Sequence, residues 1–210
     1  PWWYDFPVNE IVNKNLYHNT MCKFFLNYVV DKIIALTIWE YEQLIKEGIR
    51  KEKILVIPNG VEDEAYVLPF QGNSKFDRFK PYLLFLGRVA KEKNIDFIIR
   101  CVAKLDTVNL LIAGSIQDES YYKYLRHLIK KLHVDNRVHF VGYVRGKKKY
   151  ALIDNALAVV LVSHFEGEPM VVKEAMARGK PIIVSNKAAL PYVVEHLENG
   201  FVVSSEEEFI

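Results

Sequence analysis

The chain has 210 residues, of which 50% are hydrophobic and 26% are charged, and its formal net charge is +2. This length allows a sizeable core in one or two domains, and so small a net charge gives no field that favours nucleic acid as a partner. Two cysteines, Cys22 and Cys101, do not make a disulfide framework, so we expect a reducing, cytoplasmic setting.

The start of the chain and its apolar runs bear on targeting. No apolar run approaches the about 20 residues that a helix needs to cross a bilayer. The first ten residues, PWWYDFPVNE, lack the basic and apolar regions of a signal peptide. They also lack an initiator Met, so we expect the chain to begin inside a longer protein.

The first third of the chain predicts short strands and helices ahead of a turn-rich segment. The expected elements are a helix over 12–30, a strand over 31–37, a helix over 39–47 and a strand over 53–60. Gly48 suits the position just past a helix end. The polar stretch PFQGNSKFDRFKP, residues 69–81, is the plausible linker to the rest of the chain.

From residue 82 onward, apolar runs alternate with helical patterns. The runs predict strands at 82–89, 108–115, 138–144, 157–163, 181–186 and 200–204. The stretches between them predict helices at 94–105, 119–132, 147–156, 170–178 and 190–197. Runs that are apolar throughout suit strands buried on both faces. The alternation therefore predicts an α/β fold, a Rossmann-like parallel sheet with helices on both faces.

Ligands of such sheets bind at the carboxyl ends of the strands, so the loops there form the candidate site. The first loop, GRVAKEK, places Arg88 and Lys93 after Gly87 at a spacing that lets both side chains reach one point. An Arg fork and a Lys point charge beside a glycine turn suit a diphosphate. A solvated basic loop at a helix start is the alternative.

The next two strand ends carry small residues. The second loop begins with AGS, which contains Gly114, and the third with VGYV, which contains Gly142. Small residues at these points would let a flat nucleobase or a phosphate approach the backbone. Ordinary turn chemistry is the alternative explanation for both glycines.

The fourth loop, HFEGE, leads into the helix predicted at 170–178, and Pro169 fits the first helical position. Open backbone N–H groups around Met170 and Val171 would carry partial positive charge and favour an anion. This helix start is therefore a second candidate contact for a phosphate.

Two acids flank that helix start with seven residues between them. Glu166 lies ahead of the helix and Glu174 more than a turn inside it. Each carboxylate can accept two hydroxyl hydrogen bonds, which suits a sugar on one side of a phosphate and a ribose on the other. The alternative is that Glu166 satisfies the helix dipole and Glu174 is a surface residue.

Taken together, these loops resemble a known family. The chain resembles the retaining glycosyltransferases of family four, the nucleotide-sugar-dependent group with the GT-B fold. The matching segments, in the order and spacing of the family, are VIPNGV (56–61), GRVAKEKN (87–94), VHFVGYV (138–144), EGEPMVVKEAMARGKPIIVSN (166–186) and ENGFVV (198–203).

The resemblance implies two Rossmann-like domains, with a nucleotide-diphosphate sugar bound to the second and the acceptor, a glycan or lipid-linked molecule, to the first. It implies catalytic roles for Glu166, Arg88 and Lys93. The expected donor-binding set is Gly87, Arg88, Lys93, Gly114, Gly142, Tyr143, Val144, Glu166, Gly167, Met170, Val171 and Glu174. Of these, Arg88 and Lys93 would hold the diphosphate, and Glu174 the ribose.

The expected chemistry uses no resident cofactor and no essential metal. Glycosyl transfer leaves a nucleoside diphosphate that carries new negative charge. The chain shows no Asp-x-Asp metal signature, and Arg88, Lys93 and the helix start at Met170 can stabilise the leaving group in place of a divalent cation.

Several positions depart from the family pattern. Ala188 and Ala189 stand where the family has a glycine pair, and Tyr192 where it has a glutamate. Glu168 is an unexpected acid that would either select a donor sugar or cap the helix. His18, the one histidine ahead of the linker, lies in a helical pattern and is not expected to be catalytic.

The expected domains are a remnant of the acceptor-side domain over 1–68, a linker over 69–80, and a donor-binding domain over 81–210. The missing part of the first domain would be the rest of a longer chain or a partner in trans. A non-catalytic nucleotide-sugar-binding subunit and a sugar-nucleotide epimerase of the related fold are the alternatives. The opening PWWYDF would either touch a membrane surface or be core that truncation exposes. The run GKKKY (146–150) would either touch an anionic membrane or be a solvated helix start.

Overall fold

The computed structural model describes residues 17–67 and 76–210. Contacts divide the chain after Pro58 into two compact units. Residues 59–67, which the sequence analysis assigned to the first domain, therefore belong with the second unit. Most of the expected linker lies outside the described residues, and its described end forms a short 3₁₀ helix, Asp77–Phe79.

The first unit contains one βαβ crossover. Strands β1 (Ile33–Ala35) and β2 (Ile54–Val56) pair in parallel, and α2 (Ile38–Lys46) connects them. Helix α2 begins where the Thr37 side chain accepts a hydrogen bond from the backbone N–H of Glu40. Within the expected helix 12–30, the described segments Tyr17–Cys22 and Phe25–Val29 are helical with π-type hydrogen bonding.

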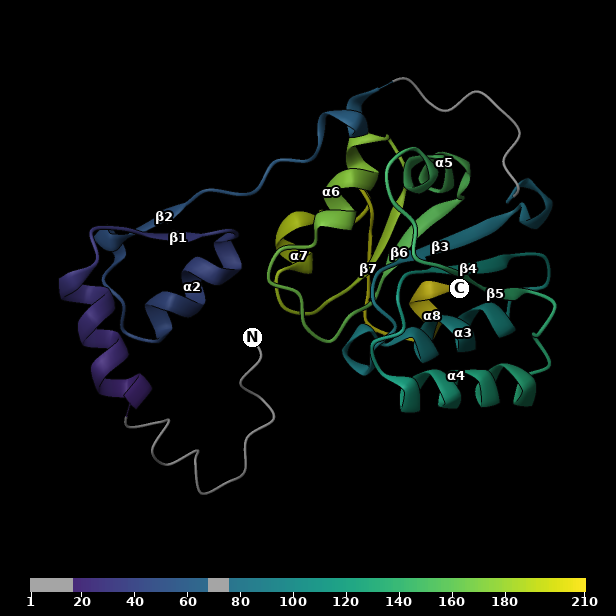
Figure 1. Ribbon diagram of the computed structural model, residues 1–210, viewed down its shortest axis with the longest axis horizontal. Helices are drawn as coiled ribbons and strands as arrows, with labels where there is room; N and C mark the ends of the chain where they lie inside the picture. Colours follow the sequence, from purple (N-terminus) through teal and green to yellow (C-terminus); the bar gives the residue numbers. More distant parts are fainter. Residues whose placement is uncertain (1–16, 68–75) are drawn as a thin grey trace. The chain divides into compact units, whose positions relative to one another are not determined.

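The second unit is built on a six-stranded parallel sheet of order β5-β4-β3-β6-β7-β8 (Figure 1). The strands are β3 (Tyr82–Leu86), β4 (Asn109–Ala113), β5 (Val138–Gly142), β6 (Ala158–Leu161), β7 (Ile182–Ser185) and β8 (Phe201–Val203). The helices are α3 (Ile95–Ala103), α4 (Glu119–Lys131), α5 (Lys147–Asn155), α6 (Met170–Ala177), α7 (Leu190–Val193) and α8 (Glu206–Phe209). Each strand and helix predicted after residue 82 is confirmed, with shorter ends.

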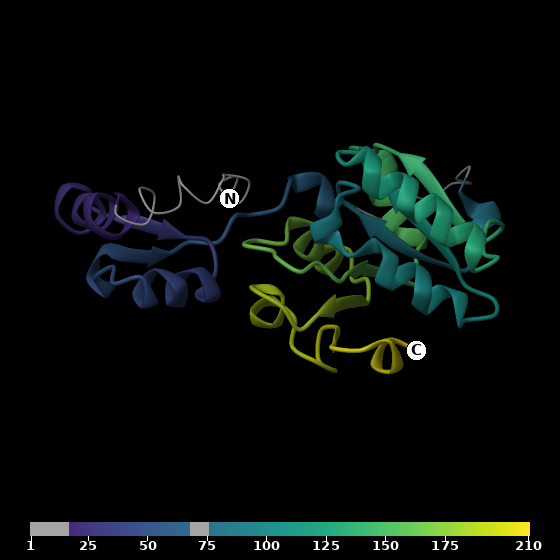
Figure 2. The same ribbon diagram turned by 90° about the horizontal axis from the view of Figure 1, so that it is seen from below.

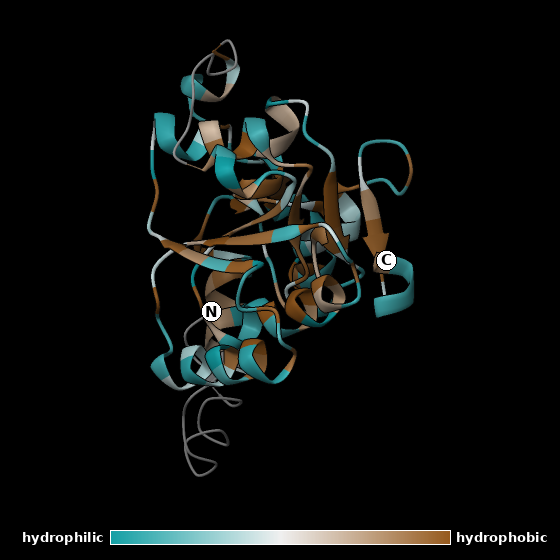
Figure 3. Ribbon diagram, turned by 90° about the vertical axis from the view of Figure 1, so that its right-hand side faces the viewer, coloured by the Kyte–Doolittle hydropathy of each residue, from teal (hydrophilic) through white to brown (hydrophobic). Residues whose placement is uncertain are grey.

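The sheet forms the centre of this unit because its strands are apolar on both faces. All five residues of β3 and all four of β6 are buried, and Figure 3 shows the sheet strands as mostly hydrophobic. Helices α3 and α4 lie on one side of the sheet, and α5 and α6 on the other (Figure 1). The last elements, α7, β8 and α8, lie together at the edge of this unit in Figure 2, as expected from the position of β8 in the sheet.

The strand order locates the expected ligand crevice. From β3 the chain runs outward to β4 and β5, and then crosses back to β6, which pairs with the other side of β3. This is the doubly wound order of Rossmann-like folds, which bind ligands where the order reverses, at the carboxyl ends of the two central strands. The predicted fold class is confirmed, and the crevice is expected beside the ends of β3 and β6.

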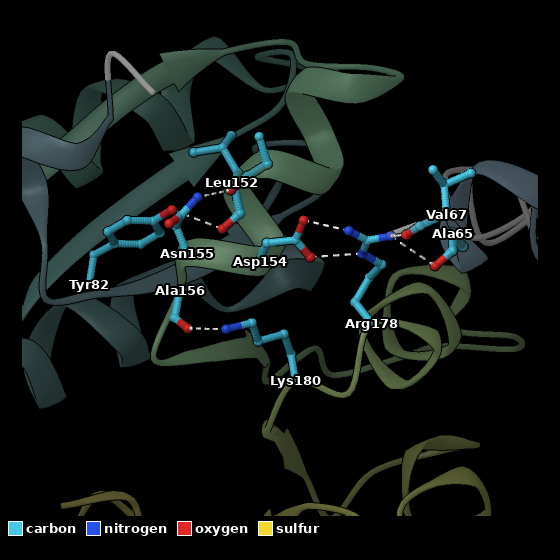
Figure 4. Close-up of polar contacts among 10 residues, drawn as sticks. Ala65, Val67, Tyr82, Leu152, Asp154, Asn155, Ala156, Arg178 and Lys180 are labelled. Atoms are coloured by element: carbon cyan, nitrogen blue, oxygen red, sulfur yellow. Dashed lines mark hydrogen bonds and ion pairs between the residues drawn. The ribbon is translucent and has the colours of Figure 1, made fainter. Parts of the chain in front are cut away.

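A buried ion pair joins the end of helix α6 to helix α5, which lies on the same side of the sheet as α6 (Figure 4). The Arg178 guanidinium donates to both carboxylate oxygens of Asp154 at the end of α5, and the side chains are 4% and 8% exposed. The same guanidinium donates to the backbone carbonyls of Ala65 and Val67. Arg178 therefore joins the end of α6, α5 and the segment after Asn59 in one cluster, which fixes the position of α6.

The chain offers no membrane-crossing helix within residues 17–67 and 76–210, because none there has the necessary length and apolar character.

Candidate functional site

A cavity of about 360 Å³ opens at the carboxyl ends of β3, β4 and β5 and the start of α6. It is bounded by three loops, by α5, and by Glu62 from the segment after Asn59. The lining residues are Glu62, Leu86, Gly87, Arg88, Ala113, Gly114, Ser115, Tyr143, Val144, Arg145, Gly146, Lys149, Met170, Val171 and Glu174. Eight of the predicted donor-binding residues are among them, and this location agrees with the crevice expected from the strand order.

The close approach of two loops explains Gly114. A Cβ atom placed on Gly114 would lie 1.7 Å from the backbone carbonyl oxygen of Gly87, far inside van der Waals contact. The loops after β3 and β4 are also joined by hydrogen bonds from Gly87 N to Ala113 O and from Val89 N to Ser115 O. Gly114 therefore lets the two strand ends meet side by side at the cavity wall.

Arg88 lines the cavity with an accessible guanidinium. Its side chain is 55% exposed, contacts the Glu92 carboxylate at 3.7 Å, and donates to the side-chain oxygen of Gln117. An exposed pair of this kind is weak, so an incoming anion can displace it at little cost. The predicted role of Arg88 as a diphosphate ligand is compatible with this placement and stays a prediction.

Lys93 and Glu166 form an ion pair away from the lining of that cavity. The Lys93 ammonium lies 2.6 Å from Glu166 Oε1, and the two side chains are 12% and 13% exposed. Ser163 Oγ donates to the same oxygen at 2.8 Å, and Ser185 Oγ donates to the Ser163 carbonyl. The structure therefore brings two predicted catalytic residues together, and it pairs Lys93 with an acid outside the cavity lining that contains Arg88.

Glu174 lines the cavity and is held by a residue that the sequence analysis did not select. The Lys149 ammonium lies 2.9 Å from Glu174 Oε1 and 3.5 Å from Glu62 Oε2, and it sits 4.6 Å from the centre of the Tyr150 ring. Burial opposes the charge of Lys149, but the hydrogen bond and charge of Glu174 outweigh it and raise the pKa of this lysine. Lys149 therefore lines the cavity as a charged side chain.

The sequence carried no signal that separates Lys149 from its neighbours in the run GKKKY. Residues three and four apart share one face of a helix, and the residues at those spacings are buried both after Lys148 (Ala151 and Leu152) and after Lys149 (Leu152 and Ile153). Lys148 is nevertheless exposed. Interpreting the run as a uniformly solvated helix start was therefore wrong for its third lysine, and the contacts of Lys149 are internal.

The start of α6 offers an anion fewer open backbone N–H groups than predicted. The Met170 and Val172 N–H groups donate to the backbone carbonyls of Glu168 and Pro169, so they close the first turn rather than facing a ligand. Met170 and Val171 still line the cavity. Gly142, in the left-handed region with φ of 75°, and Gly167 lie outside the lining set.

Glu168 does not have the helix-capping role considered for it. Its carboxylate is 4% exposed and accepts hydrogen bonds from the backbone N–H and side-chain amide of Asn59 and from the Lys173 ammonium. Its side chain does not cap α6, and it does not line the cavity. Glu168 instead binds the segment that begins at Asn59 to the start of α6.

The substituted glycine pair leaves a strained alanine. Ala188 adopts φ of 48°, in the left-handed region that favours glycine. The next residue, Ala189, donates its backbone N–H to the carbonyl of Glu166 at 3.1 Å. The turn thus keeps a glycine-like backbone without glycine, and it supports the loop that carries Glu166. Within residues 17–67 and 76–210, no three His, Cys, Asp or Glu side chains cluster as metal ligands would.

The doubly wound sheet, with a mixed-charge cavity at its switch point, defines a Rossmann-like α/β protein whose candidate ligand site lies at that point. Residues 70–209 match the family model described as glycosyl transferases group 1. That match covers well over half of the chain, so the chain belongs to the group 1 glycosyltransferase family.

Relatives and solved structures agree with this assignment. An uncharacterized glycosyltransferase of Methanocaldococcus jannaschii is 30% identical over 73% of this chain and 41% of its own length. A probable sucrose-phosphate synthase of Thermosipho melanesiensis is 29% identical over 76% of this chain and 38% of its own. The Anabaena protein HepE, solved with UDP and glucose, superposes with a TM-score of 0.78 at 22% identity, over 90% of this chain and 54% of that chain. This chain thus spans less than half of those two curated relatives.

Proposed function

We propose that this chain supplies the donor-binding part of a glycosyltransferase that moves a sugar from a nucleotide-diphosphate sugar to an acceptor with retention of configuration. The observation that carries the proposal is the cavity at the switch point, where Arg88 and Glu174 line one space in a chain of the group 1 family. The acceptor is a glycan or a lipid-linked molecule, and a second domain, in the same protein or in trans, completes the site.

The charge of each site residue determines the part of the donor that we propose it contacts. Arg88 offers an accessible fork of donors to the diphosphate, and Glu174 accepts from the ribose hydroxyls. Glu166, with Lys93 against it, meets the donor sugar near the reacting carbon. In the reaction the bond from the anomeric carbon to the phosphate oxygen breaks, a bond to the acceptor oxygen forms, and the proton of the acceptor hydroxyl passes to the departing diphosphate. Arg88 and Lys93 stabilise the departing diphosphate by electrostatics.

Nucleotide binding is the first test of this proposal. Because HepE was solved with UDP, the panel begins with UDP and UDP-glucose and continues with the GDP and ADP counterparts. A ligand at 100 times its Kd stabilises by about 2.7 kcal/mol, which a thermal-shift assay detects. We expect one nucleotide series to stabilise the chain, and Glu174→Gln and Arg88→Met to weaken its binding at least tenfold. Lys148→Met, which also removes an exposed cation, is the matched control. A chain that binds no member of the panel would refute the proposal.

Transfer and its metal requirement need separate measurements. We expect residues 1–210 alone to bind the nucleotide but transfer sugar poorly, and the longer protein to transfer it without divalent metal. Activity that is lost in chelator and restored by magnesium would count against metal independence. The anomeric proton coupling of the product, measured by nuclear magnetic resonance, decides between retention and inversion.

A further inference from the structure

The Lys149–Glu174 pair is built more firmly than an exposed ion pair. The two side chains are 16% and 14% exposed, and the ammonium lies 2.9 Å from Glu174 Oε1. Glu62 and the Tyr150 ring contact the same ammonium from two further directions. Three groups thus hold Lys149 in one place against the cavity wall.

This arrangement uses only one oxygen of the acid. Among the described residues, Glu174 Oε1 receives the Lys149 hydrogen bond, and no side chain or backbone group there donates to Oε2. Glu174 lies inside α6, so the helix fixes its backbone position, and the hydrogen bond from Lys149 holds its carboxylate. A single strong contact at Oε1 therefore determines how the second oxygen faces the cavity.

We propose that Lys149 is a positioning residue for the ribose: it holds Glu174 by one oxygen so that the other accepts hydrogen bonds from the 2′- and 3′-hydroxyl groups of the nucleotide. This inference rests on the proposed function, because it concerns the nucleotide in the same cavity. It gives a role to the third lysine of the GKKKY run. Lys149 acts through Glu174 and is not itself a catalytic residue.

A different role would produce a different binding pattern. If Lys149 bound the diphosphate directly, its removal would weaken ribonucleotides and deoxyribonucleotides by the same factor. If it only positions Glu174, its removal selectively weakens nucleotides that have the hydroxyl groups. The ratio of the two Kd values, measured in one protein sample, separates these roles and is insensitive to a partly unfolded fraction.

The experiment measures the Kd of UDP and 2′-deoxy-UDP, and of the ADP and GDP pairs, by titration calorimetry with residues 1–210. We expect wild type to favour the ribonucleotide about tenfold. Lys149→Met should bring the ratio below threefold, while Lys149→Arg, which keeps a cationic donor, should restore part of it. Lys148→Met, one residue away with the same charge change, should leave both Kd values within twofold of wild type.

The outcomes distinguish this inference from the function on which it rests. Wild type that binds none of these nucleotides would overturn the proposed function. Wild type that binds them while Lys149→Met keeps the tenfold ratio, or weakens both nucleotides equally, would overturn the role of Lys149 alone. A wild-type ratio near one would also overturn it, because Glu174 would then not be reading the ribose.

Discussion

Replacing Arg178 by Met tests whether one buried ion pair holds α6 in place. The guanidinium donates to both carboxylate oxygens of Asp154, at 2.7 and 2.5 Å, and to two backbone carbonyls. The variant leaves the Asp154 carboxylate, 8% exposed, without its buried cation. Removing one partner of such a pair costs about 3–5 kcal/mol. For a unit of residues 59–210, each kcal/mol lowers Tm by about 2–4 °C, so we expect a loss of roughly 6–20 °C.

Thermal unfolding followed by far-ultraviolet circular dichroism measures the change, and amide hydrogen exchange locates it. We expect the faster exchange of Arg178→Met to include α5 and α6, because the ion pair joins these helices. Arg126→Met is the matched control, since Arg126 is exposed on α4 and the change in the side chain is the same. Its Tm should stay within about 2 °C of wild type, as expected for a surface substitution.

A double variant separates the loss of the pair from the loss of packing. Replacing a buried ion pair by apolar side chains is often close to neutral, whereas breaking it is costly. Arg178→Met with Asp154→Leu should therefore be more stable than Arg178→Met alone. The reasoning is refuted if Arg178→Met destabilises no more than Arg126→Met. It is also refuted if the effects of the two substitutions simply add.

Three further predictions concern single positions. Ala188→Gly should stabilise the chain by up to about 1 kcal/mol in urea unfolding, because it relieves the left-handed backbone at φ of 48°. Ala103→Gly in α3 is the control and should destabilise the chain. A loss of stability in both variants would contradict this prediction. Burial lowers the pKa of His139 from its ordinary 6.5, so below about pH 6.5 the unfolded chain binds the extra proton more readily, and stability falls as pH falls. His139→Gln should lose less Tm than wild type between pH 7.5 and 5.5, and an equal loss in both proteins would argue against this assignment. Burial raises the pKa of the Cys101 thiol to about 12, so Cys22→Ser should react with a thiol reagent only after denaturation, and rapid labelling of the native variant would show that Cys101 is accessible.

The order of the second unit was predictable because its strands are apolar throughout and its helices are amphipathic. Runs such as YLLFL, which became β3 with every residue buried, are typical of strands at the centre of a parallel sheet. The loops at the strand ends followed from that order, and with them Arg88, Gly114 and Glu174 at the cavity. Local patterns thus locate elements and the edge where ligands bind.

The hydrogen-bond partners of the charged side chains were not predictable, because these contacts join segments that lie far apart in sequence. Glu168 is held by Asn59, 109 residues earlier in the chain, as well as by the nearby Lys173, so the local sequence does not indicate its contact with Asn59. The unit boundary at Pro58 depends on the same long-range contacts, which draw residues 59–67 onto α6. A turn-rich stretch marks where a chain can be flexible, but it does not say which neighbouring residues pack with which unit.

The acids Glu166 and Glu174 show the same limit within the site itself. Seven intervening residues place Glu166 in a loop and Glu174 more than a turn into the helix, and the two acids do not share one cation. Each takes a lysine from a different strand end: Lys93 follows β3, and Lys149 follows β5. The spacing therefore indicates only where the acids lie relative to the start of α6, whereas we expect their function to depend on these lysines. Because Arg88 remains 55% exposed while both lysines are held by acids, we expect the diphosphate to meet Arg88 first and to reach Lys93 only by competing with Glu166.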